Sequence, residues 1–522
     1  MKKRQWISLF LLFCMAGRMM AQLTPRRHSA ASLNQNTRAL LDEAMALGDR
    51  FWSNRSSLLE HPATQPGGDH PQLYLVRESS WYAMGLLLRD APGDRERAAA
   101  TLDAVLRAQY TTPGTRWYGT FRRSPEEGTP VGQGRMWGNY DPNWREFIGS
   151  AFAIILTEFP DRISADLARR MHAAIDCALQ GEMQEGRLLP TYSNIALMYA
   201  FLLDYAAEND GHKEWRKLSA SWSRRVYQLY KQHECFFEYN SPTYYGVDLF
   251  GLALWRSYGS TAEMRRMGSE MEASLWREIA SYYSPSLRNL GGPFDRAYGM
   301  DMESYVSLTG VWLRTQLPAE VAPLPVVTPA TDHLADIWFA PQIALLGAAI
   351  PQPALQSFTH FTGEHLLNRP ITAQRRATAW IGDSILIGGE ATAKTKKAGP
   401  ESQFHPATIQ WRTPSGKIGW VNVVESPMVD AIAGKDGLSI SASGNIRLLI
   451  HADGTQAEAI SAGRWNLPGL HIAASSDARD FHLENHGDAL ELTYTGLTKM
   501  RLKIERSGAA GPDAASQASS GQ

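Results

Sequence analysis

Two adjacent tyrosines mark the first segment whose residues could do chemistry, FFEYNSPTYYGVDLFGLALW at 236–255. Ser241 and Pro242 predict a helix start, with the serine as N-cap and the proline at the first helical position. Successive helical residues point about 100° apart, so Tyr244 and Tyr245 cannot face the same place. Either both rings fill a helical core, or one lines a cleft, where two polar residues before the helix could orient it: Glu238 and Asn240.

A second helix start, GNYDPNWREFIGSAFAIIL at 138–156, combines an aromatic ring with an arginine. Asn143 is a good N-cap, and Trp144 and Arg145 follow it in the first turn. In a cleft wall the ring would stack on a sugar, and the guanidinium would hold a sugar carboxylate with two hydrogen bonds. Asn139, in the segment that leads into this helix, is predicted to bind substrate together with Trp144 and Arg145. The alternative is a capped helix end with an Arg–Glu surface pair.

Three further segments carry candidate residues. Asn194 lies in the first turns of a predicted helix, where asparagine is a weak helix former and has either a local hydrogen bond or a role in a cavity. Arg296 and Tyr298, in GGPFDRAYGMDMESYVSL at 291–308, would give a cleft rim a cation and a ring, or would belong to an ordinary polar loop. His405 opens a predicted strand after a long polar loop, from which it could reach an interdomain cleft, although a lone histidine is more often structural.

The elements that must position these residues begin with helices. Apolar residues recur at three- and four-residue spacing in ten segments, which predicts ten helices. They are 37–52, 74–88, 95–109, 144–158, 164–179, 192–205, 215–230, 245–258, 260–283 and 302–313. Successive helices in this number, with few strands between them, indicate a helical toroid or a large bundle.

The chain then changes character. Residues 316–332 are rich in proline and are interpreted as a linker. Short alternating or β-branched runs follow and predict antiparallel strands. They are 334–339, 378–387, 407–412, 417–424, 438–441, 446–450 and 490–494. The predicted fold class is therefore α+β multidomain, with an all-α domain at 22–315 and an antiparallel β-sandwich at 333–506. Residues 507–522 are small and polar and are expected to be disordered.

Composition excludes some classes of function. The formal net charge is −1, so the chain has no excess of positive charge with which to bind nucleic acid. The 16 Trp and 19 Tyr fit either a large helical core or a carbohydrate cleft. No nucleotide, zinc or haem motif is present, so no cofactor and no catalytic metal are expected, with structural calcium left open.

The N-terminus predicts export. A basic start, a short apolar stretch and small residues before Gln22 are typical of a secretory signal peptide at 1–21, which implies a secreted or periplasmic protein. No second apolar stretch is long enough to span a membrane. Cleavage would leave Cys177 and Cys235, which could pair.

The order F-E-x-x-S-P-x-Y at the head of a helix resembles the heparinase II/III-like polysaccharide lyases. The resemblance implies an (α/α) toroid joined to antiparallel β-sheets, with Tyr244 as the catalytic tyrosine. It also implies that Asn194, in a Ser-Asn pair fifty residues upstream, neutralises a sugar carboxylate, and that His405 completes the site from the β domain. In many of these lyases a histidine follows the asparagine or the tyrosine, whereas this chain has Ile195 and Tyr245 there.

The implied activity is β-elimination from a uronic-acid-containing glycan. Asn194, helped by Arg145 or Arg296, would stabilise the charge that develops on the uronate when its C5 proton leaves. Tyr244 would serve as both base and acid if the two reacting groups lie on one sugar face. If they lie on opposite faces, His405 is the base and Tyr244 the acid. The expected partner is an acidic polysaccharide or oligosaccharide.

Two other classes stay open. A glycoside hydrolase on the same toroid would need two carboxyl groups at a defined separation. The candidates are Asp141, Glu146, Glu238, Asp248 and Asp301. The third class is a non-catalytic glycan-binding protein.

Overall fold

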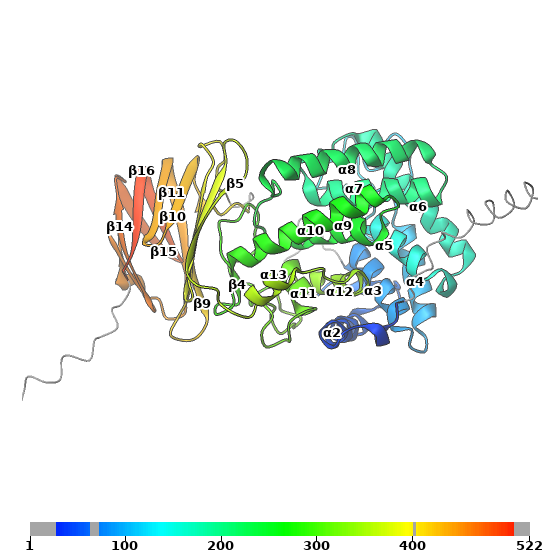
Figure 1. Ribbon diagram of the computed structural model, residues 1–522, viewed down its shortest axis with the longest axis horizontal. Helices are drawn as coiled ribbons and strands as arrows, with labels where there is room; N and C mark the ends of the chain where they lie inside the picture. The colour runs from blue at the N-terminus through cyan, green and yellow to red at the C-terminus, as the bar shows by residue number, and fades with distance from the viewer. Residues whose placement is uncertain (1–27, 63–72, 400–402, 506–522) are drawn as a thin grey trace, which may run out of the picture.

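The computed structural model describes residues 28–62, 73–399 and 403–505. The predicted signal peptide at 1–21 and the predicted disordered tail at 507–522 lie outside these residues. Helices fill one end of the molecule and strands the other (Figure 1). This order confirms the predicted fold class, a helical N-terminal part followed by an antiparallel β part.

Four pairs of consecutive helices form two layers. In each pair the first helix is inner, and nearly all of its residues are buried, whereas the second is outer and amphipathic. The inner helices are α3 (Val76–Arg89), α5 (Trp144–Glu158), α7 (Ser193–Asn209) and α9 (Tyr244–Tyr258). Their outer partners are α4 (Asp94–Arg107), α6 (Ala165–Glu185), α8 (Lys213–His233) and α10 (Ala262–Tyr282).

The outer helix α8 shows why the layers form. Its buried residues are spaced three or four apart, so they make one stripe toward the inner layer: Trp215, Ser219, Ser223, Val226 and Tyr230. The inner helix α7 is apolar almost all round, so it has to be covered on every side. The two patterns together specify a ring of buried helices inside a ring of amphipathic ones.

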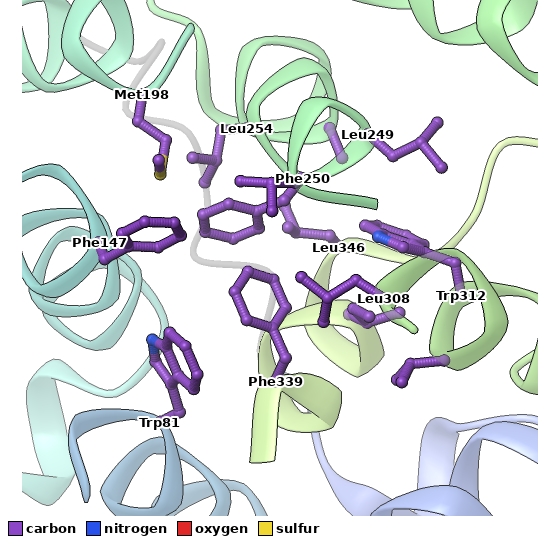
Figure 2. Close-up of a cluster of buried hydrophobic side chains, with 14 of the residues drawn as sticks. Trp81, Phe147, Met198, Leu249, Phe250, Leu254, Leu308, Trp312, Phe339 and Leu346 are labelled. Carbon is purple, nitrogen blue, oxygen red and sulfur yellow. The ribbon is translucent and has the colours of Figure 1, made fainter. Parts of the chain in front are cut away.

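Further helical elements accompany the four pairs. They are α2 (Gln35–Phe51), α11 (Leu308–Arg314), the 3₁₀ helix η3 (Leu334–Phe339), α12 (Ala340–Leu346) and α13 (Gln352–Ser357). Helix α12 packs on both α3 and α9. Phe339 inserts between the two sides, with its ring edge-on to Trp81 at 4.7 Å and to Phe250 at 4.9 Å (Figure 2). These contacts join the first and last inner helices, as a toroid requires.

All ten predicted helices are present, but the helical part continues beyond them. The predicted strand at 334–339 is wrong, because this segment is η3, and α12 and α13 follow it. Leu334, Ile337 and Trp338 are spaced as on one helical face, and all three are buried in the helical core. The helical spacing outweighs the short apolar run on which the strand prediction rested.

Antiparallel strands form the second part. Their bounds are β5 (His365–Pro370), β6 (Arg376–Ile381), β7 (Ile385–Ala391), β8 (Ala407–Arg412), β9 (Ile418–Glu425), β10 (Val429–Gly434), β11 (Gly437–His451), β12 (Ile460–Ser461), β13 (Arg464–Leu467), β14 (Leu470–Ser476), β15 (Asp480–Asn485) and β16 (Leu490–Glu505). The main path runs β12-β13-β14-β16-β11-β9-β8-β7-β6-β5, with β10 paired to β11 and β15 to β16. Because β10 also packs on β6 and β7, the sheet folds over into two layers around its own apolar core.

The other six predicted strands fall within this sheet, and the predicted strand 378–387 is divided into β6 and β7. Strand β8 has the predicted bounds, and the predicted strands 438–441 and 446–450 are one long strand, β11. A bulge at Gly444, where φ is +127°, shifts the register of β11 against β16. Cys177 and Cys235 are both free, so the pairing that the sequence left open does not occur.

A segment of the helical part pairs with the β part. Phe294 and His405 exchange backbone hydrogen bonds of 3.1 and 2.8 Å. Next to them, Asp295 is buried and accepts hydrogen bonds from Arg375 and Lys396. These contacts fix the loop that carries Arg296. Within the described residues, no helix combines the length and the apolar character that a membrane crossing requires.

Candidate active site

A cavity of about 810 Å³ opens where the inner helices begin. Five helices contribute a residue at or just before their first turn: Arg77 of α3, Asn143 before α5, Asn194 of α7, Tyr244 of α9 and Leu308 of α11. The first N–H groups of a helix have no partner within it, and the positive end of its dipole lies there. Helix starts that converge on one cavity favour a negatively charged ligand.

Tyr244 is the first residue of α9, two positions later than the proline start that the sequence predicts. The Ser241 hydroxyl still acts as a cap, since it accepts a hydrogen bond of 3.0 Å from the Tyr244 N–H. Tyr244 is half-buried and lines the cavity, whereas Tyr245 is fully buried in the core. The two tyrosines therefore divide as the second interpretation of the sequence expects.

The Tyr244 hydroxyl has two close partners. It accepts a hydrogen bond of 2.5 Å from Nη2 of Arg296 and lies 2.7 Å from the Tyr298 hydroxyl. The Arg296 guanidinium also lies over the Tyr244 ring, 3.8 Å from its centroid. Burial raises the pKa of Tyr244 well above its ordinary value, and Tyr298 adds to this, while the Arg296 cation opposes it. The phenol therefore keeps its proton at neutral pH.

Glu238 joins Arg296 to Asn194. One of its carboxylate oxygens accepts a hydrogen bond of 2.8 Å from Nη1 of Arg296, and the other accepts one from the Asn194 amide. Burial raises the pKa of Glu238, and the Arg296 cation opposes that rise. From the β part, the Gln403 side chain accepts a hydrogen bond of 3.2 Å from Nε of Arg296. This network holds Arg296 and Asn194 in fixed orientations at one wall.

A second arginine, Arg77, also lines the cavity. The Arg77 guanidinium lies over the rings of Trp81, Phe147 and Trp144, at 4.9, 5.1 and 5.3 Å from their centroids. It also pairs with the buried Glu78 at 2.6 Å. Such stacking and pairing orient a guanidinium toward one side.

Two carboxyl groups line the cavity together with Arg77, namely Asp141 and Asp336. Burial raises the pKa of both. Asp141 was among the carboxylates proposed from the sequence. The other four, Glu146, Glu238, Asp248 and Asp301, are not part of the cavity lining.

The structure brings four predicted site residues to the cavity: Tyr244, Asn194, Arg296 and Tyr298. Glu238 lies behind them and contacts two of them. Asn194 and Tyr244 start neighbouring inner helices, which is why residues fifty positions apart meet.

Two residues predicted to bind substrate at the start of α5 are structural instead. Arg145 is completely buried, where it pairs with Glu182 at 3.1 Å and Glu185 at 2.7 Å. Trp144 is buried beneath Arg77 and is outside the cavity lining. A buried cation needs its partners, so Arg145 has no capacity left for a sugar carboxylate.

Three more of the predicted substrate contacts lie elsewhere. Asn139 is exposed in a loop, where its side chain accepts a hydrogen bond of 2.9 Å from the Arg135 N–H. Asn240 is buried with φ +49°, and its amide donates to the carbonyls of Gly291 and Pro293. Tyr245 belongs to the core. Trp137, two residues before Asn139, does line the cavity and is 58% exposed.

His405 is not part of the cavity lining. Its Nε2 donates a hydrogen bond of 3.2 Å to the carbonyl of Ala297, and its Nδ1 accepts one of 2.9 Å from the Asn422 amide. Burial lowers the pKa of His405 to about 4. The residue predicted to be a catalytic base therefore braces the loop that carries Arg296.

Several residues of the cavity lining were not predicted from the sequence, among them Tyr192, His333 and Asp336. Tyr192 precedes α7 and accepts a hydrogen bond of 2.9 Å from the Asn143 amide. His333 and Asp336 fall in the stretch that was assigned to the start of the β domain. A prediction of a helix at 334–339 would have placed His333 and Asp336 at a helix start, where the other predicted site residues also lie.

No group of residues suited to hold a metal ion occurs in the cavity, as far as the described residues go. One group of three potential ligands, Glu484, His486 and Glu491, lies in the β part. The first two are exposed, and Glu491 already pairs with Arg447.

Comparisons with known families and structures give the following matches. A family model described as a domain of unknown function, DUF8769, matches residues 38–348, and a second one, DUF8770, matches residues 359–497. None of the curated proteins matches the chain in sequence.

Solved structures are similar to this chain at low identity. The crystal structure of heparinase III has 10% identity and a TM-score of 0.40, covering 96% of this chain and 92% of that one. Heparan sulfate lyase HepC from Pedobacter heparinus has 9% identity and a TM-score of 0.34, with 91% and 83% covered. The GH127 β-arabinofuranosidase BT3674 has 10% identity and a TM-score of 0.34, with 90% and 77% covered.

Proposed function

The chain belongs to the DUF8769 family, and we propose that it is a polysaccharide lyase that cleaves a uronic-acid-containing glycan by β-elimination. The observation that carries the proposal is the contact between Tyr244, Arg296 and, through Glu238, Asn194. It combines a phenol, a cation and an amide in one cavity at the start of several helices. Elimination from a uronate uses such groups to protonate the leaving oxygen and to stabilise the charge on the carboxylate.

The substrate is an acidic sugar. Arg296 and the first turns of α7 and α9 give one wall positive potential, to which a carboxylate is attracted. Loss of the C5 proton turns the uronate carboxylate into a species with more negative charge, which Arg296 and Asn194 stabilise more strongly than the ground state. A difference of this kind lowers the barrier of the reaction.

Tyr244 is the proton donor. Burial raises the pKa of this phenol, so at neutral pH its oxygen carries a proton that it can give to the departing O4 oxygen. Arg296 then stabilises the phenolate that remains, because its Nη2 already contacts the phenol oxygen. Of the two roles that the sequence left open for Tyr244, this pKa supports the acid and not the base. The C5 proton needs a separate acceptor.

Absorbance of the purified protein with a panel of uronate glycans tests the proposal. The panel comprises alginate, heparan and chondroitin sulfates, pectins and glucuronan. Elimination leaves a C4=C5 double bond conjugated to the carboxylate, so the expected result is a rise in ultraviolet absorbance with at least one glycan. New reducing ends without that absorbance would contradict the proposal.

Glycoside hydrolysis is the second candidate, favoured by the two carboxyl groups in the cavity, Asp141 and Asp336. A raised pKa suits a general acid, and burial raises the pKa of both. A hydrolase would use these two residues, at about 5–5.5 Å for retention or 6.5–9.5 Å for inversion. Asp141→Asn distinguishes the candidates, since it should abolish hydrolysis and leave elimination within about tenfold of wild type.

The place of action follows from the substrate and from the N-terminal sequence. We expect the protein to be secreted or periplasmic, because residues 1–21 have the pattern of a signal peptide and acidic glycans are extracellular.

A further inference from the structure

The lyase chemistry leaves one role without a residue, the acceptor of the C5 proton. We propose that His333 accepts it, which rests on the proposed function of the same cavity. His405, the base predicted from the sequence, lies outside the cavity lining and uses both ring nitrogens in hydrogen bonds. His333 lines the cavity, and neither of its ring nitrogens has a hydrogen bond to any described residue.

His333 lies at the start of η3, at the edge of the cavity. It is the N-cap of η3, with φ +55°, and its carbonyl accepts a hydrogen bond of 3.0 Å from the Asp336 N–H. His333 and Asp336 both line the cavity, while Leu334 and Ile337 are buried in the core.

Tyr298 connects His333 to the proton donor. The His333 ring stacks on the Tyr298 ring, with centroids 4.0 Å apart and an angle of 27° between the planes. The Tyr298 hydroxyl lies 2.7 Å from the Tyr244 hydroxyl. One aromatic ring therefore sets the position of both His333 and Tyr244, as a reaction with two proton transfers on one sugar requires.

The cavity lining around His333 includes charged groups. Asp336 interacts electrostatically with both His333 and Arg77, and Arg77 is paired with Glu78. Asp141, the other carboxylate of the cavity, already accepts a hydrogen bond of 2.9 Å from the Asn143 N–H.

The step balances without a cofactor. A ring nitrogen of His333 takes the C5 proton, and the electrons of the C5–H bond form the C4=C5 double bond. The C4–O4 bond breaks with its electrons on O4, which receives the proton of Tyr244. The products are imidazolium, phenolate, an unsaturated uronate and a new hydroxyl end. Solvent returns the proton from His333 to Tyr244.

Two variants of His333 test the inference because both suit the positive φ of this position. His333→Asn keeps a residue that tolerates left-handed backbone, and His333→Gly also leaves space for a small molecule. We expect each variant to lose about 10²–10⁴-fold in kcat on the glycan that wild type cleaves, and added imidazole to restore activity in His333→Gly. His360→Ala is the control, since His360 is exposed, lies outside the cavity lining and has a hydrogen bond to Thr359; its kcat should equal that of wild type.

The outcomes separate this inference from the proposed function. Loss of kcat with imidazole rescue supports the role of His333. Wild-type kcat in both His333 variants, with unsaturated product still formed, would overturn the inference and leave the lyase intact. Loss of kcat that imidazole does not restore, together with an unchanged KM, would also contradict a base at this position. A wild-type protein that forms no unsaturated product on any uronate would overturn the proposed function and the inference with it.

Discussion

At the scale of single residues, Tyr244 and Arg145 show what a sequence can and cannot specify. Helix geometry predicted correctly that Tyr244 and Tyr245 face different surroundings. Arg145 was assigned to a sugar carboxylate, but Glu182 and Glu185 of another helix already neutralise it. Whether an arginine is available to bind a substrate depends on the carboxylates that the fold brings close to it. The local sequence around the arginine does not show which carboxylates these are.

The role of Tyr244 as an acid gives the first prediction. Tyr244→Phe should lose about 10²–10⁴-fold in kcat on the natural glycan, because the departing oxygen no longer receives a proton. A uronide with fluoride at C4 expels a leaving group that needs no proton. The rate at which Tyr244→Phe eliminates fluoride from this uronide, measured as fluoride release, should stay within about tenfold of the wild-type rate.

Tyr245→Phe is the matched control, since this neighbouring ring is buried in the core. Its kcat on both substrates should equal that of wild type. If Tyr244→Phe loses as much activity on the fluoride as on the glycan, the phenol acts as the base and the assignment is wrong.

At the scale of elements, the cavity depends on where helices start. The apolar spacing identified ten helices, but three of the residues that matter lie at helix ends, where spacing is least informative. Tyr244 starts α9, Asn194 is second in α7, and His333 caps η3. His333 was missed because the short apolar run that follows it was interpreted as a strand, and a proline-rich stretch precedes it.

Close packing of α9 against α11 supports this arrangement and gives the second prediction. A Cβ at Gly246 would come within 2.4 Å of the Leu308 Cβ and 2.7 Å of the Thr309 backbone nitrogen. Since backbone has to move, Gly246→Ala should lower the free energy of unfolding by about 1–3 kcal/mol, despite the better helix propensity of alanine. Urea unfolding measures this.

Gly149→Ala provides the comparison, because it too lies in an inner helix. There a Cβ would meet a flexible side-chain end, Leu202 Cδ1 at 2.9 Å. We expect this variant to be the more stable of the two. Equal stability would mean that α11 can move away from α9 at little cost in free energy, so that Gly246 does not fix the distance between the two helices.

At the scale of the whole molecule, the two parts are joined at the loop that carries Arg296. The sequence predicted an all-α part followed by an antiparallel β part, and it selected His405 as the residue by which the second reaches the site. His405 lies at this junction, where it bonds Ala297 and Asn422, and it is not part of the cavity lining. Which atoms meet across a junction depends on tertiary packing. The sequence therefore identified His405 as a junction residue but could not show what its side chain contacts.

The junction gives the third prediction, a pH dependence. Burial lowers the pKa of His405 to about 4, from an ordinary value of about 6.5. Between these values the unfolded chain binds a proton that the folded one does not, so this residue makes stability fall as pH decreases from about 6.5 to 4. His405→Gln can keep both hydrogen bonds and has no such proton, so its Tm should fall less over that range.

Activity separates this structural role from a catalytic one. The kcat of His405→Gln at neutral pH should stay within about tenfold of wild type, because the residue lies outside the cavity lining. A loss of 10²-fold or more at unchanged Tm would return His405 to the catalytic role that the sequence suggested.

Whether the glycosidic bond breaks by elimination can be read from the mass of the products formed in heavy-oxygen water. Wild-type protein is incubated with the uronate oligosaccharide that it cleaves, and both fragments are analysed by mass spectrometry. Elimination predicts that the fragment carrying the uronate is lighter by one water and that neither fragment takes up oxygen from the solvent during cleavage. A fragment that gains heavy oxygen at its new reducing end, with no unsaturated partner, would contradict the account and assign the cavity to hydrolysis by Asp141 and Asp336.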